Sequence, residues 1–133
     1  MARTQKCDRK DASTRLAHAR KFLEVAEIVP DDQIAESGSV AAALAVLAGI
    51  AASDAACCVA LGRRSRGEDH HDAEELLEGI SPGGADAAEA LRRLLDLKDT
   101  AQYGLTNISG ARLKTALRQA NKLVEFAAVV LTR

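Results

Sequence analysis

The longest apolar stretch of the chain, residues 40–61, reads VAAALAVLAGIAASDAACCVAL and holds only two polar side chains, Ser53 and Asp54. Alanine, leucine and valine without proline favour an α-helix. Apolar side chains occur on every side of that helix, which indicates burial on most sides. The stretch is long enough to span a bilayer, but it is mostly alanine and contains Asp54. We therefore expect a buried central helix and no membrane span.

Apolar residues recur at steps of three and four on both sides of this stretch, which predicts further amphipathic helices. The first is expected to begin near Asp11 or Ser13 and to end at Pro30. A short helix capped by Asp69 or Asp72 should follow the central helix. The stripes expected to be buried are Ala12, Leu16, Ala19, Leu23 and Ala26 in the first helix and Ala73, Leu76, Leu77 and Ile80 in the short one.

Two more helices are predicted in the last third of the chain. One starts near Asp86, and its apolar spacing also places Lys98 on the inward side. The last follows the capping candidates Asn107 and Ser109. Their stripes are Ala87, Leu91, Leu94 and Ala101, extended to Leu105, and then Leu113, Ala116, Ala120, Leu123, Ala127 and Val130.

Composition supports the same fold class. Only 2% of the residues are aromatic, so the core must consist of Ala, Leu, Val and Ile, which suits helices better than sheets. No strand-like alternation occurs. We predict an all-α, up-and-down bundle of about five helices around the long alanine-rich one, with residues 11–133 as a single domain and residues 1–10 as a flexible tail.

Charge and cysteine content bear on partners and compartment. The net charge of −1 removes overall basicity as an indication of nucleic-acid binding, so such binding must come from a local patch. Cys7 is set apart from the adjacent pair Cys57 and Cys58, and an odd, clustered set of this kind suggests reduced thiols. The first fifteen residues lack the apolar run of a secretory signal. We expect a cytoplasmic protein.

A zinc site would have the right residue types in Cys57, Cys58, His70 and His71, but the spacing argues against it. Adjacent helical residues point about 100° apart, so the two cysteines cannot converge on one metal. Neither GxGxxG nor a P-loop occurs. The sequence therefore predicts no metal and no cofactor.

Asp54 lies within the apolar helix and should be paired with a cation, because an isolated buried carboxylate is costly. Lys98, on the inward stripe of its helix, is the preferred partner, and an arginine of residues 63–66 is the alternative. We interpret Asp54 as a structural polar contact and not as a catalytic carboxylate.

The densest chemistry lies in GRRSRGEDHHD, residues 62–72. Arg66 and His71 have four residues between them, a spacing at which a guanidinium and an imidazole can reach one phosphate. Arginine stabilises phosphoryl charge and histidine moves a proton near neutral pH. The alternative is a solvated turn whose charges interact with Glu68, Asp69 and Asp72.

Taken in order, ARKFLEVAE, the alanine-rich helix, GRRSRGEDHHDAEELL and LRRLLDLKDTAQYG resemble the HEPN superfamily of small helical domains over nearly the whole chain. The resemblance implies a dimerising helical bundle. It also implies a metal-independent endoribonuclease whose catalytic Arg and His have four to six residues between them. Arg66 with His71, or Arg64 with His70 or His71, fits that spacing. The KDTAQYG segment is similar to the RxxADYG segment of one branch, in which Lys98 takes the place of arginine and Tyr103 follows.

Two function classes follow. The first is an RNA-cleaving toxin or defence component that works as a homodimer with a partner such as a minimal nucleotidyltransferase. The second is a non-catalytic helical dimer that binds protein or nucleic acid. In either case we expect one polar cleft that contacts RNA phosphate, with His71 as acid or base and Arg66 as the phosphorane stabiliser if cleavage occurs. Its expected lining residues are Arg64, Arg66, His70, His71, Lys98 and Tyr103.

Overall fold

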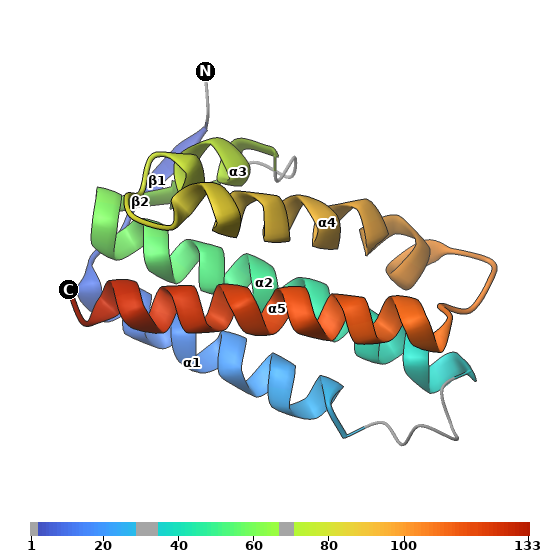
Figure 1. The fold of residues 1–133 in the computed structure, drawn as a ribbon. Coiled ribbons are helices and arrows are strands. Elements are labelled where there is room, and N and C mark those ends of the chain that lie inside the picture. The colour runs from blue at the N-terminus through green and yellow to red at the C-terminus, as the bar shows by residue number, and fades with distance from the viewer. Residues whose placement is uncertain (1–2, 29–34, 67–70) are drawn as a thin grey trace.

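The computed structural model describes residues 3–28, 35–66 and 71–133, and helices account for most of them (Figure 1). The helices are α1 (Arg9–Ala26), α2 (Ala35–Leu61), α3 (His71–Glu78), α4 (Gly84–Tyr103) and α5 (Gly110–Leu131). The predicted all-α bundle is confirmed. Its centre is the predicted alanine-rich helix, because α2 packs against α1, α4 and α5.

The small side chains of α2 let its neighbours approach closely. Gly49 lies where α2 meets both α4 and α5, and a Cβ added there would collide with Leu94 and come within 3.1 Å of Leu123 Cδ1. Within the described residues α2 is the one helix long and apolar enough to cross a membrane, yet 67% of its most apolar 18-residue window is buried inside the fold. Packing within the bundle thus accounts for most of its apolar character.

The predicted stripes form the core. Every stripe residue named for α1, α3 and α5 is buried, as are Ala87, Leu91 and Leu94 of α4. Ala101 is half-buried and packs at the edge of the core. The extension of the α4 stripe to Leu105 is wrong, because α4 ends at Tyr103 and Leu105 is fully exposed in the connection to α5.

A small sheet joins β1 (Thr4–Lys6) to β2 (Arg63–Ser65) in antiparallel register, with Gln5 opposite Arg64. Within the stretch predicted to be a flexible tail, residues 4–6 thus form a strand that pairs with β2, although the sequence shows no strand-like alternation. Gly62, with φ of 72°, ends α2 in the left-handed conformation and turns the chain into β2. Strands of three residues are too short to show an alternating pattern, so no local signal predicts them.

The start of α1 is fixed directly after β1. Asp8 accepts a hydrogen bond from the backbone N–H of Asp11, and Asp11 accepts one from the backbone N–H of Asp8, which makes a reciprocal capping box. The helix therefore begins at Arg9, slightly before the predicted start. As a result β1 and α1 follow each other without a flexible linker.

Candidate functional site

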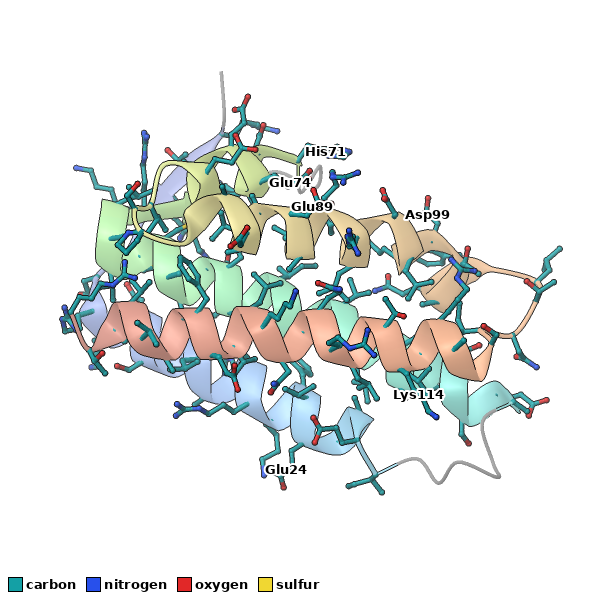
Figure 2. All side chains as sticks on the ribbon, viewed as in Figure 1. Glu24, His71, Glu74, Glu89, Asp99 and Lys114 are labelled. Carbon is teal, nitrogen blue, oxygen red and sulfur yellow. A yellow bond between two sulfur atoms is a disulfide. The ribbon has the colours of Figure 1, made fainter. Side chains whose placement is uncertain are left out.

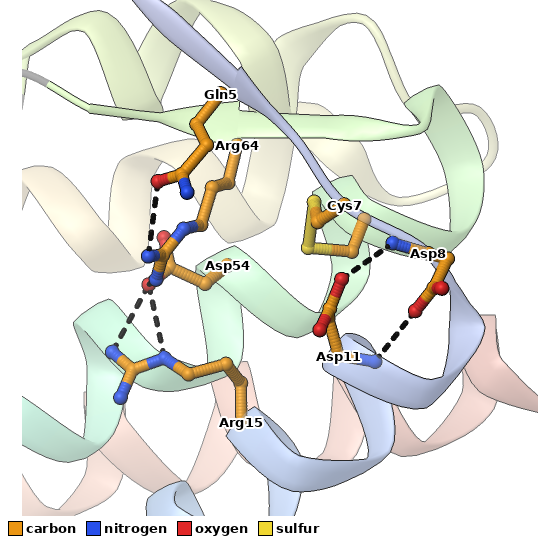
Figure 3. The surroundings of a disulfide bond; sticks show 8 residues. Gln5, Cys7, Asp8, Asp11, Arg15, Asp54 and Arg64 are labelled. Carbon is orange, nitrogen blue, oxygen red and sulfur yellow. Dashed lines mark hydrogen bonds and ion pairs between the residues drawn. A yellow bond between two sulfur atoms is a disulfide. The ribbon is translucent and has the colours of Figure 1, made fainter.

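Asp54 is the one charged residue that the bundle buries among the residues the structure describes. Its Oδ2 accepts hydrogen bonds from Arg15 Nε and Arg64 Nη1, both at 3.1 Å (Figure 3). Arg64 Nη2 also donates to Gln5 Oε1 at 3.2 Å. We call these four side chains the Asp54 cluster. It joins β1 and α1 to α2 and β2, two pairs of consecutive elements that are distant from each other in the sequence.

Burial is the main influence on the Asp54 carboxyl. Loss of solvation raises the pKa of Asp54 above its ordinary value of 3.8, whereas the positive charges of Arg15 and Arg64 act to lower it. The two guanidinium groups therefore offset part of the cost of burying a carboxylate, and their remaining exposure to water limits what they contribute.

The prediction that Asp54 is buried and paired with a cation is confirmed, but the preferred partner is wrong. Lys98 lies in the second half of α4, which runs antiparallel to α2 and reaches the level of Gly49 already at Leu94. Asp54 instead faces α1 and β2. Arg64 belongs to the alternative partners predicted among residues 63–66, whereas Arg15 lies outside them.

Cys7 and Cys58 form a disulfide with a Cα–Cα distance of 5.2 Å, which corrects the prediction of reduced thiols. The bond anchors the end of β1 to α2 beside the Asp54 cluster (Figure 3). Cys57 is free and buried, and burial raises the pKa of its thiol to about 12, so it is a poor nucleophile near neutral pH. Because of this disulfide, the argument from reduced thiols no longer supports a cytoplasmic location. That location stays a prediction.

A hollow of about 190 Å³ lies next to the cluster. Its lining residues are Gln5, Lys6, Cys7, Asp11, Thr14, Arg15, Cys58 and Arg64. The Arg15 guanidinium already contacts Asp54 and His18, and the Arg64 guanidinium contacts Asp54 and Gln5. The two guanidinium groups therefore have few donors left for an anion, and their contacts favour a clamp between the N-terminal segment and the bundle.

Arg66 directly precedes and His71 directly follows residues 67–70, which lie outside the described residues. The predicted site residue His70 falls within this undescribed segment. Both named side chains are exposed. The backbone N–H of Arg66 donates to the Arg3 carbonyl at 2.8 Å, which extends the pairing of the two strands. His71 Nδ1 lies 2.5 Å from Glu74 Oε2, so a carboxylate orients the imidazole.

Lys98 and Tyr103 are not brought to the same place as Arg64. Arg64 lies at the end of the bundle that carries the strands, whereas Tyr103 closes α4 at the opposite end (Figure 1). Lys98 is half-buried and Tyr103 is 75% exposed. In Figure 2, His71 and Glu74 appear beside Glu89 in the first half of α4, and Asp99, the neighbour of Lys98, lies farther along. The described residues of the predicted cleft therefore do not form one cleft.

One side of α2 is left uncovered by the other helices. Val40, Ala43, Leu47 and Ile50 follow one another on this side at steps of three, four and three, and we call them the α2 seam. Val40 is 61% exposed and Leu47 is 36% exposed. Beside the seam, a hollow of about 460 Å³ is lined by Val25, Ile28, Glu36, Ser37, Val40, Ala41 and Leu44.

Sequence reasoning missed Gln5, Cys7 and Arg15 as parts of the site. Cys7 and Gln5 were assigned to a flexible tail, although they pair with residues of α2 and β2. Arg15 directly precedes the buried Leu16 and lies three residues after the buried Ala12, so its position beside the apolar stripe was the available signal.

The chain matches no protein-family model, and no curated protein matches it.

Proposed function

We propose that the chain is a homodimeric helical-bundle interaction module, in which the α2 seam of one copy packs against the seam of a second. The observation that carries this proposal is the apolar spacing of Val40, Ala43, Leu47 and Ile50, of which Val40 and Leu47 are exposed and Ala43 and Ile50 are half-buried. Apolar residues at alternating steps of three and four are the pattern by which two helices interlock side chains. A soluble protein rarely leaves a contiguous apolar surface without a partner.

A second copy is the occupant that fits this seam. A two-fold dimer brings the same patch of both subunits together, so the patch must be complementary to itself. The four seam positions carry no charge, and an identical seam therefore meets them without like-charge repulsion. The exposed Val25 and Ile28 beside the seam extend the apolar surface that the second copy would cover.

Sedimentation at micromolar concentration tests the dimer. The wild type should sediment as a particle of twice the 14.0 kDa chain mass, and Leu47→Glu should sediment as a monomer because a carboxylate would be buried in the seam. Val40→Glu, at a more exposed seam position, should have the same effect. Val129→Glu is the matched control, since Val129 is an exposed apolar residue of α5 at 53% exposure.

Each variant should keep the wild-type circular dichroism spectrum and melt cooperatively, which separates loss of the dimer from loss of the fold. A monomeric wild type would refute the proposal. So would a dimer that tolerates both seam substitutions.

RNA contact through Arg66 and His71 is the second candidate function, and the His71–Glu74 pair favours it. A carboxylate 2.5 Å from Nδ1 sets the orientation of the imidazole, as expected for an acid or base. In the proposed reaction the ribose 2′-oxygen attacks the adjacent phosphorus and the 5′-oxygen leaves. The products are a 2′,3′-cyclic phosphate and a 5′-hydroxyl, and no metal is needed. Under this second candidate function, the chain would be an HEPN-like protein that works with a nucleotidyltransferase-type partner.

Cleavage of a mixed RNA pool in EDTA tests this candidate. Arg66→Ala and His71→Ala should each abolish cleavage, and Glu74→Gln should reduce it by weakening the orientation of His71. His18→Ala is the matched control, because His18 is another exposed histidine that lies on α1, where its Nδ1 contacts Arg15 at 3.4 Å. Salt-sensitive binding without cleavage would indicate an RNA-binding module. The absence of both binding and cleavage would refute RNA contact.

A further inference from the structure

The faces of α4 and α5 form a groove on the side of the bundle away from the α2 seam. Figure 1 shows the two helices running alongside each other in front of α2. Two neighbouring hollows, of about 670 and 240 Å³, lie along them, and Arg93 and Gln119 line both. We call this the α4–α5 groove.

The two walls of the groove carry opposite charge. Asp86, Glu89 and Asp96 line it from α4, against the single cation Arg93. Arg112 and Lys122 line it from α5, and Arg133 follows that helix, against the single acid Glu125. Within the described part of the chain, no ion pair joins one wall to the other.

Among the described residues, the ion pairs of the wall residues stay within one wall, since Glu89 binds Arg92 and Arg93, all from α4. Arg133 reaches across one end of the groove, where it donates to the backbone carbonyl oxygens of Ser81 and Pro82, just before α4. The opposite charges of the two walls are thus held apart across the groove, where a bound partner can meet both.

Between the walls the groove is lined mainly by apolar side chains, with the polar Gln119 where the two hollows meet. Ala87, Ala90 and Ala116 lie buried beneath it, so Phe126 and Val129 offer most of the apolar contact. Phe126 is half-buried and Val129 is 53% exposed. An apolar floor between two charged rims is the form of site into which an amphipathic helix packs.

We propose that the α4–α5 groove binds an amphipathic helix of a partner protein. The apolar stripe of that helix would face Phe126 and Val129. Its basic flank would lie along the acidic wall of α4, and its acidic flank along the basic wall of α5. The lining residues of α4 run from Asp86 to Leu97, which at 1.5 Å per residue is about 17 Å, or three helical turns.

The shape and charge of the groove favour this occupant over two others. Two parallel ridges accept a single helix between them, whereas a second copy of this face would present another groove. A nucleic-acid backbone would be attracted to Lys122 but repelled by Asp86 and Asp96. The groove lies opposite the α2 seam, so this inference is independent of the homodimer.

A designed peptide is the probe. An 18-residue helix with a Leu/Ala stripe, lysines on one flank and glutamates on the other, would be titrated into the protein and followed by fluorescence anisotropy. Two control peptides keep the stripe but carry only lysine or only glutamate on both flanks. The mixed peptide should bind at least about tenfold more tightly than either control, because only it complements both walls.

Protein variants locate the binding. Lys122→Glu should weaken the mixed peptide about tenfold, since it reverses one charge of the α5 wall. Lys114→Glu is the matched control, because Lys114 is an exposed lysine of α5 outside the groove, and it should leave affinity unchanged. Equal affinity for all three peptides, or equal effects of the two variants, would overturn the proposal. Loss of the homodimer in Lys122→Glu would overturn it in favour of a second copy.

Discussion

Arg15 of α1 donates a hydrogen bond from Nε to Oδ2 of Asp54 on α2 at 3.1 Å, and its Nη2 forms an ion pair with the same oxygen at 3.0 Å. Arg64 donates to that oxygen as well, at 3.1 Å. One buried carboxylate oxygen therefore joins α1, α2 and the strand that follows α2. Together with the nearby disulfide, this contact holds the N-terminal segment against the bundle. We expect loss of the contact to lower the free energy of unfolding.

Asp54→Ala should destabilise the fold. Breaking a buried ion pair leaves uncompensated charge and costs about 3–5 kcal/mol, and we expect the lower end because the Arg15 and Arg64 side chains are 25% and 33% exposed and can turn to water. Urea unfolding at pH 7 measures the change. Glu24→Ala is the control, since its exposed pair with Lys21 should be worth less than about 1 kcal/mol. Equal midpoints for the two variants would contradict the prediction.

The stability that Asp54 contributes should depend on pH. Burial raises its pKa in the folded state, so the folded protein holds this proton more tightly than the unfolded chain does. The stability gained by protonating Asp54 in the folded state is therefore complete below the ordinary pKa of 3.8 and is lost as the pH rises through the folded pKa, after which the contacts of the carboxylate with Arg15 and Arg64 remain. As the pH rises from 3 to 7, the unfolding free energy of the wild type should fall relative to that of Asp54→Asn. A shift towards wild type would mean that the two arginines outweigh burial.

Reduction of the Cys7–Cys58 disulfide should lower the melting temperature. Its loop spans 51 residues, and the chain-entropy relation gives about 4 kcal/mol for a loop of this length. For a chain of this size that corresponds to roughly 15 °C. Dithiothreitol should lower the melting temperature of wild type but not that of Cys7→Ser. The unfolded, unreduced protein should show one reactive thiol, Cys57, and a count of three would restore the prediction of reduced cysteines.

Gly84→Ala should disturb the junction of α3 and α4. A Cβ at Gly84, the first residue of α4, would collide with the backbone carbonyl of Leu77, which cannot turn aside as a side chain can. Overpacking of this kind costs about 1–3 kcal/mol. Thermal unfolding would be compared with Ala85→Ser, a change at the next, exposed position. A melting temperature equal to that of Ala85→Ser would show that the junction adjusts freely.

Helical periodicity was enough to predict the bundle and most of its core. The stripe from Ala12 to Ala26 and that from Leu113 to Val130 are buried as expected, because each lies on one face of a single helix and needs no knowledge of the partner helix. The same reasoning showed that Asp54 must be paired, since its apolar surroundings are visible in the sequence around it.

The partner of Asp54, the disulfide and the sheet were decided by tertiary structure. Lys98 and Arg64 both offered a cation, and only the antiparallel course of α4 and the turn at Gly62 determine which one reaches the carboxylate. Cys7 and Cys58 are 51 residues apart, and their pairing depends on where β1 lies against α2. Periodicity indicates which face of a single helix is buried, whereas contacts between distant segments depend on how the helices and strands are arranged in space.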